Sequence, residues 1–124
     1  MPNFSWKEYL ILARFLEDQR MPACSPEAVN RTVVNRSYYA AFCSCRDFAG
    51  RHLGLPRDET QNVHRKVRDA FQNQGNPKLR PIAMYLGQLS RWRKQCDYEN
   101  YVEKLERITS ESLRCSEEIL SRIE

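Results

Sequence analysis

The side chains with the greatest potential for chemistry lie close together between positions 91 and 98. Arg91 and Arg93 are followed by Asp97 and Tyr98. A guanidinium group presents a planar fork of donors that fits phosphate or carboxylate, so two arginines here could hold a phosphate. We expect Asp97 to orient Arg93 or Arg36. We expect Tyr98 to donate a hydrogen bond or to stack on a base.

The same residues also have purely structural interpretations. Arg36 could form an ion pair with Asp97 that orients two helices. Asp97 could instead be the N-cap of a following helix, and Tyr98 could pack with its hydroxyl group hydrogen-bonded. The sequence leaves both interpretations open for each residue.

A second group of candidates lies in the basic stretch over residues 57–94, which holds nine basic and three acidic side chains. Such a stretch is compatible with binding to nucleotide or RNA phosphates, although ordinary solvated charge gives the same composition. His64 lies in this stretch and is a candidate proton carrier, because imidazole titrates near neutral pH. The expected phosphate-binding residues are Arg36, Arg65, Lys66, Arg68 and Lys94.

No metal or cofactor site is expected. The chain has five cysteines and two histidines, without a Cys-x-x-Cys motif. Cys43 and Cys45 are two positions apart, so they point to different faces of a helix and cannot chelate together. The odd number of cysteines favours reduced thiols and a cytoplasmic protein. We also expect no signal peptide, because the first residues contain neither a basic nor an apolar stretch of that kind. The sequence has no Gly-rich phosphate loop and no apolar run of about 18 residues that would suggest a membrane span.

The elements that must position these residues are predicted to be helices throughout, since no sustained alternation or Asn-Gly hairpin turn occurs. Ser25 is the predicted N-cap of a long second helix that runs to about His52, with Gly54 as its stop signal. The predicted starts of the later helices are Thr60, Pro81, and Asp97 or Asn100. We therefore expect one all-α domain over residues 1–124, an up-down bundle of about five helices with a long central second helix.

Residues 36–48 form the middle of that second helix. No charge, Gly or Pro occurs from Tyr38 to Cys45, so the helix is apolar almost all the way round and should be buried on more than one side. One interpretation is a central core helix. The other adds a homodimer seam, formed by Tyr38, Ala41 and Cys45.

Three pieces of the sequence resemble the HEPN superfamily of small α-helical domains. They are Arg36-Ser-Tyr-Tyr-Ala-Ala-Phe42, the basic helix that carries His64, and Arg93-Lys-Gln-Cys-Asp-Tyr98, which is similar to the Arg-x-x-Ala-Asp-Tyr ending of one HEPN branch. Their order and spacing agree, and the resemblance spans roughly residues 5–120. It implies a homodimeric bundle of four to five helices. Many HEPN proteins are metal-independent ribonucleases, often toxins paired with a nucleotidyltransferase antitoxin or parts of defence systems.

The chain departs from the HEPN catalytic motif, which is an Arg, four to six further residues, and a His. Counting from Arg91, the position for His is occupied by Cys96, and from Arg93 by Asn100. A thiol is a poor proton shuttle near neutral pH, so His64 or His52 would have to replace the missing group. In paired systems the antitoxin can adenylylate a Tyr two residues after the His, and Tyr98 matches that spacing from Cys96.

Two functions follow as expectations. The first is a HEPN-family RNA- or nucleotide-binding protein of toxin–antitoxin or defence type, with a divergent metal-independent ribonuclease as its enzymatic form. The alternative is a non-catalytic interaction module that binds a nucleotidyltransferase or another defence partner, and the missing His favours it.

Overall fold

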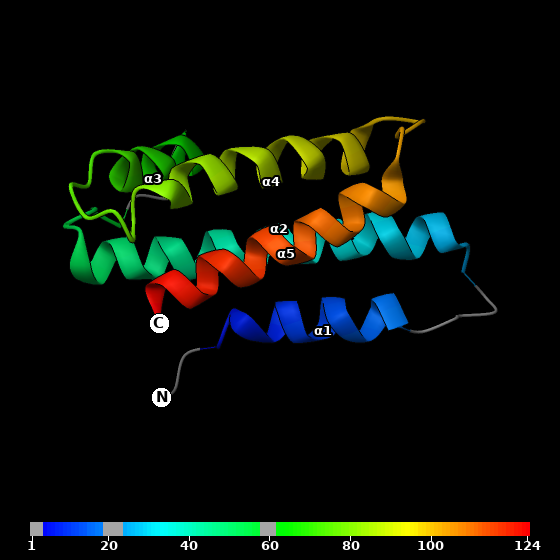
Figure 1. The fold of residues 1–124 in the computed structure, drawn as a ribbon, viewed down its shortest axis with the longest axis horizontal. Coiled ribbons are helices and arrows are strands. Elements are labelled where there is room, and N and C mark those ends of the chain that lie inside the picture. Colours follow the sequence, from blue (N-terminus) through cyan, green and yellow to red (C-terminus); the bar gives the residue numbers. More distant parts are fainter. Residues whose placement is uncertain (1–3, 19–23, 58–61) are drawn as a thin grey trace.

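The computed structural model describes residues 4–18, 24–57 and 62–124. These residues form five helices and no strand. The helices are α1 (Lys7–Asp18), α2 (Pro26–His52), α3 (Val63–Gln72), α4 (Pro81–Tyr98) and α5 (Leu105–Ile123). The long α2 lies across the middle of the bundle and contacts each of the other four helices (Figure 1). The predicted all-α bundle of five helices with a long central second helix is confirmed.

Local signals in the sequence set the ends of α2. The Ser25 side chain accepts a hydrogen bond from the backbone N–H of Ala28 at 3.1 Å, as expected of an N-cap. The helix ends at His52, and Gly54 follows with a positive φ of 70°. The predicted start of α4 at Pro81 is also confirmed. The expected cap at Thr60 lies outside the described residues.

The last helix begins later than predicted. Asp97 lies inside α4, and Asn100 lies in the turn that follows, so neither caps α5. The helix starts at Leu105, after Lys104 with a φ of 57°. A residue far away in the sequence stabilises this turn. The guanidinium group of Arg31 on α2 donates to the carbonyl oxygens of residues 99 and 100 at 2.6 and 3.1 Å. A contact between residues so far apart in sequence overrides the local capping signal.

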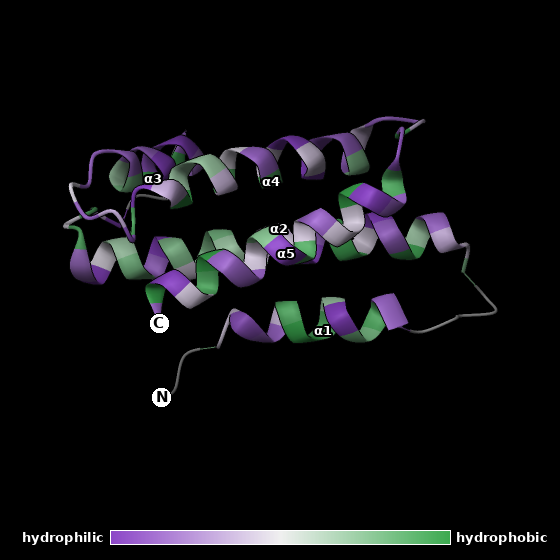
Figure 2. Ribbon diagram, viewed as in Figure 1, coloured by the Kyte–Doolittle hydropathy of each residue, from purple (hydrophilic) through white to green (hydrophobic). Residues whose placement is uncertain are grey.

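The core has two parts, which lie on different sides of α2. One part joins α2, α3 and α4 with the end of α5, and the other lies between α1, α2 and α5. Hydrophilic and hydrophobic residues both occur on every helix (Figure 2). In α3 and α5 the two kinds lie on separate faces, as in amphipathic helices. None of the helices in the described ranges is long and apolar enough to cross a membrane.

Tyr38, Ala41 and Cys45 belong to this core. Their exposed fractions are 2%, 0% and 0% within the single chain. Neighbouring helices of the same chain cover α2 on both sides, so none of the three side chains reaches a surface that a second subunit could contact. The placement of a dimer seam at these residues is therefore corrected, and residues 36–48 form a central core helix.

Candidate functional site

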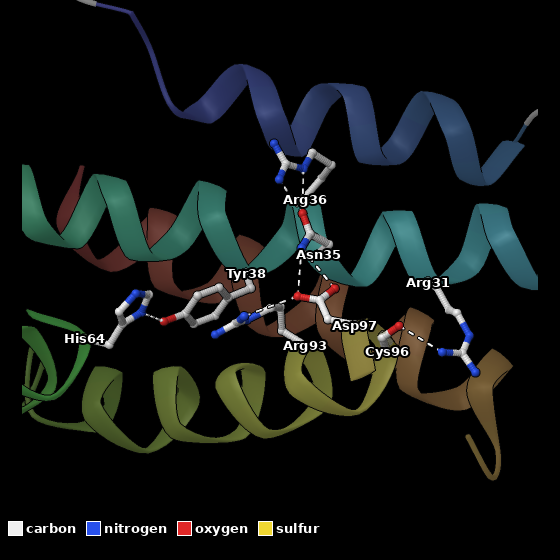
Figure 3. A network of polar contacts seen from close by, with 8 residues as sticks. All are labelled: Arg31, Asn35, Arg36, Tyr38, His64, Arg93, Cys96 and Asp97. Carbon is white, nitrogen blue, oxygen red and sulfur yellow. Dashed lines mark hydrogen bonds and ion pairs between the residues drawn. The ribbon is translucent and has the colours of Figure 1, made fainter. Parts of the chain in front are cut away.

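A row of polar side chains runs between α2 and α4, from His64 at one end to Asp97 at the other (Figure 3). Asn35 continues the row across α2 to Arg36, whose guanidinium group lies on the side of α1, over the Tyr9 ring. Arg93 lies in the middle and forms an ion pair with Asp97 at 3.2 Å, one helical turn away on α4. The amide nitrogen of Asn35 donates to both Asp97 carboxylate oxygens, at 3.2 and 3.3 Å. The side-chain oxygen of Asn35 in turn accepts a hydrogen bond from Arg36 Nε at 2.9 Å. Asn35 thus links Arg36 to Asp97, and Arg36 does not pair with Asp97 directly.

Arg93 is a buried cation, with 8% of the residue exposed. Its guanidinium carbon lies 5.1 Å from the ring centroid of Tyr38 and 5.6 Å from that of Tyr39, within cation–π range. Burial works to lower the pKa of Arg93, but the hydrogen bond to Asp97, together with the electrostatic effects of Tyr39, Tyr38 and Asp97, outweighs it and raises this pKa above its ordinary value. Arg93 therefore stays charged and is held inside the bundle, which is not where an incoming phosphate would first make contact.

His64 faces α2 and does not point out from the basic surface of α3. Its ring stacks on Phe42, with centroids 4.1 Å apart and planes 11° from parallel, and its Nδ1 is hydrogen-bonded to the Tyr38 hydroxyl group. Burial lowers the pKa of His64, and the nearby charges of Arg93, Lys94 and Arg68 lower it further. The imidazole is therefore neutral at physiological pH, in the form that can accept a proton.

The outward-facing basic side chains lie on α3 and α4. The Nη1 atoms of Arg68 and Arg91 lie 3.8 and 3.9 Å from the point that a Cβ would occupy on Gly87. The two guanidinium groups thus converge over Gly87, and neither makes a hydrogen bond or an ion pair with the described residues. Arg68 is partly buried and Arg91 is exposed, as are Arg65, Lys66 and Lys94 on the same two helices.

Few acidic groups balance this charge. Asp69 is the one acidic residue among the described residues between 57 and 94, and it lies 3.9 Å from Arg65. That pair is widely exposed and weak. The convergence of Arg68 and Arg91 therefore gives the α3–α4 surface a positive potential that no carboxylate of the described residues neutralises locally.

Cys96 occupies the position where the HEPN motif has a His. The residue is 5% exposed, and burial raises the pKa of its thiol above the ordinary value. The thiol therefore remains protonated at neutral pH and is a poor proton acceptor. The backbone carbonyl of Cys96 accepts a hydrogen bond from Arg31 at 2.9 Å (Figure 3).

Tyr98 stands apart from the polar row. It is the last residue of α4 and is 77% exposed, which leaves its hydroxyl group open to modification. A shallow pocket of about 410 Å³ lies nearby, at the Arg36 end of the row, and Arg31, Asn35 and Asp97 contribute to its walls.

Sequence reasoning missed Arg31 and Asn35. They lie four residues apart on α2, on the side that faces the end of α4. Polar residues at this spacing, one turn before an apolar stretch, were the available signal.

No group of three or more His, Cys, Asp or Glu side chains among the described residues could hold a metal ion. Comparison with known proteins gave no matching family model, no matching curated protein and no matching solved structure. The findings thus establish a small all-α protein with five helices, and no family match supports the HEPN resemblance.

Proposed function

We propose that this protein is a HEPN-type RNA-binding protein of toxin or defence kind, which holds phosphates on the outer surface of α3 and α4. The observation that carries the proposal is the convergence of Arg68 and Arg91 over Gly87. Two unpaired guanidinium groups side by side offer bidentate donors to adjacent phosphates of a single strand. Lys94 and Arg65 extend the positive surface along the two helices.

The polar row between α2 and α4 supports this role by holding α3 and α4 in place. The hydrogen bond between Tyr38 and His64 ties α3 to α2, and the ion pair of Arg93 with Asp97 is joined to α2 through Asn35. These contacts fix α3 and α4 on a common helix. The spacing of the two helices that carry Arg68 and Arg91 is therefore set before any ligand arrives.

The experiment is a binding titration of a fluorescent single-stranded RNA by anisotropy, at several salt concentrations. For single strands, the logarithm of the binding constant falls with the logarithm of salt by about 0.7 per phosphate contact. We expect the Arg68→Ala/Arg91→Ala double variant to bind more weakly and to lower this slope by roughly 1.4. The matched control is Arg107→Ala/Arg114→Ala on α5, which removes the same charge elsewhere. An equal loss in both variants would mean that only net charge matters, and it would contradict the proposal.

The same mixtures, kept in EDTA and then run on a denaturing gel, test the enzymatic form of the proposal. In that form, neutral His64 would supply the proton transfer that Cys96 cannot. RNA cleavage by the wild type, and not by a His64→Gln variant that still binds RNA, would establish a metal-independent ribonuclease. Intact RNA after prolonged incubation would restrict the function to binding.

The alternative function rests on the outer face of α1. Ile11, Leu12 and Phe15 lie there with exposed fractions of 60%, 43% and 58%. Large apolar side chains gathered on one exposed helix face favour a non-catalytic module that binds a protein partner. The partner would be a nucleotidyltransferase or another defence component. Copurification with a nucleotidyltransferase encoded beside it, lost in the Ile11→Gln/Phe15→Gln variant, would support this function.

Three further features belong to the proposal. The protein would act in the cytoplasm, in keeping with its five free cysteines. A homodimer would have to use surface residues in place of Tyr38, Ala41 and Cys45. In a toxin pair, exposed Tyr98 would be the residue that a nucleotidyltransferase adenylylates.

A further inference from the structure

A cleft of about 550 Å³ lies at the end of the bundle where α2 finishes, apart from the convergence of Arg68 and Arg91. The beginning of the described chain forms one wall, with Phe4 and Trp6. The last turns of α2 form another, and Leu55 and Pro56 add apolar surface. A volume of this size falls in the range typical of small-molecule sites.

The aromatic wall is held in place by its own contacts. Trp6 Nε1 donates a hydrogen bond to Asp47 Oδ2 at 3.0 Å, which fixes the indole plane against α2. Phe4 packs edge-on against Trp6, with ring centroids 5.0 Å apart and planes at 77°. Because Phe4 is still 50% exposed, its ring has free surface on which a planar group can stack.

The α2 wall is positively charged. The guanidinium group of Arg51 is exposed and makes no ion pair or hydrogen bond within the described ranges. Arg46 lies 5.5 Å from the Trp6 ring centroid, and its contacts to Asp47 are long, at 3.4 Å. Asp47 lines the same wall and forms an ion pair with Arg46, so the wall holds two guanidinium groups against one carboxylate. The wall therefore has donors to offer an anionic group.

Gly50 keeps the cleft open between these two arginines. It lies inside α2, where glycine destabilises a helix relative to alanine. A Cβ added there would meet only the Leu55 carbonyl oxygen, at an ordinary contact distance of 3.8 Å. Packing of the helix therefore does not require glycine, whereas any larger side chain would enter the cleft.

We infer that this cleft binds a mononucleotide, with the planar base against Phe4 and Trp6 and the phosphate on Arg46 and Arg51. An aromatic surface next to two guanidinium groups matches a ligand that carries a ring at one end and a dianion at the other. This site goes beyond the proposed RNA contacts, because it uses α1 and α2 in place of the outer surface of α3 and α4.

The test uses the fluorescence of Trp6 in a Trp92→Phe background, in which Trp6 is the sole tryptophan. We expect adenosine monophosphate to change this fluorescence saturably. Adenosine, which lacks the phosphate, and inorganic phosphate, which lacks the ring, should each bind at least about tenfold more weakly. Binding of all three with equal affinity would overturn the inference.

Variants locate the site. Arg51→Ala should weaken binding of adenosine monophosphate about tenfold, and Gly50→Leu should abolish it. Arg107→Ala removes an exposed arginine of α5, outside both proposed sites, and should leave this binding unchanged. Circular dichroism checks that each variant folds. If Gly50→Leu does not fold, Arg51→Ala decides the matter.

Two further outcomes separate this inference from the proposed function. Affinity that is unchanged in Arg51→Ala but lost in Arg68→Ala/Arg91→Ala would place the nucleotide on the α3–α4 surface and overturn the cleft. RNA anisotropy that is normal in Arg51→Ala, together with loss of mononucleotide binding, would support two separate sites.

Discussion

The chemistry of single residues in this bundle is set mainly by burial. His64 is flanked by aromatic rings and faces three basic side chains, so its neutral form is favoured. Tyr38 is 2% exposed, and burial raises the pKa of its hydroxyl group, which therefore stays protonated. A neutral imidazole and a neutral phenol can share a hydrogen bond without placing an unpaired charge in the core.

The lowered pKa of His64 predicts how stability depends on pH. The unfolded chain takes up a proton near the ordinary value of 6.5, whereas the folded chain does so only at a lower pH. The contribution of His64 to the free energy of unfolding is thus complete above 6.5, and it is lost as the pH falls through the folded pKa. Urea unfolding between about pH 8 and about pH 5 measures this loss.

A single variant shows whether His64 is the group responsible. His64→Gln should flatten the pH dependence in this range. NMR of the ring C–H signals gives a second readout, with an expected midpoint below 6.5 for His64. A midpoint above that value would contradict the burial argument.

At the scale of helices, the ends that depend on neighbouring residues could be predicted from the sequence. The ends that depend on contacts between distant residues could not. Ser25, Gly54 and Pro81 act on their own neighbours, so the ends of α2 and the start of α4 could be predicted. The start of α5 could not, because Arg31 binds the turn before it from another helix. Because the helix over residues 36–48 is apolar on almost every side, its burial could be predicted. Whether helices of the same chain or of a second subunit bury it could not be predicted.

The candidate site follows the same division. The contact between Arg93 and Asp97 follows from their spacing of four on one helix, which the sequence shows directly. The link through Asn35 and the inward orientation of His64 depend on how α2, α3 and α4 pack together. A single sequence contains no local signal for the angle at which these helices meet.

Arg31 is expected to be a major stabiliser of the corner between α4 and α5. Its guanidinium group satisfies three backbone carbonyl groups, those of residues 96, 99 and 100. The carbonyl of Cys96 is among the acceptors that the end of α4 leaves unpaired, and the other two lie just beyond that end. We expect Arg31→Ala to lower the free energy of unfolding by about 2 kcal/mol in urea titrations, as hydrogen bonds from a charged group suggest.

The matched control for this prediction is Arg114→Ala. Arg114 pairs with Glu111 on the same helix, and its side chain is 61% exposed. Exposed pairs of this kind contribute little, so we expect a much smaller change than for Arg31→Ala. Equal effects in the two variants would show that the contacts of Arg31 to the backbone do not stabilise the corner.

At the scale of the whole molecule, the central position of α2 decides what a large substitution does. Ala41 is fully buried within one chain. Ala41→Trp should therefore overpack the core and lower the free energy of unfolding by roughly 3 kcal/mol or more. Thermal melts at several protein concentrations measure this. The loss should be the same at each concentration, because the contacts are within the chain.

The control places the same side chain on the surface of the same helix. Ala28 is exposed, so Ala28→Trp should change stability by no more than about 0.5 kcal/mol. If Ala41→Trp were folded and as stable as the wild type but had a smaller mass by size-exclusion chromatography, Ala41 would lie at a subunit interface, and the prediction would be wrong.

The ion pair between Lys7 and Glu124 brings the start of α1 close to the end of α5. Their side chains lie 2.7 Å apart although the residues are 117 positions apart in the sequence. The first turn of α1 and the last turn of α5 lie at the same end of the bundle (Figure 1). A short linker could join these two points without crossing the core. The chain could then be opened in the exposed loop at residues 75–78, between α3 and α4. Such a circular permutant would contain the same five helices in a new order, beginning with α4 and ending with α3.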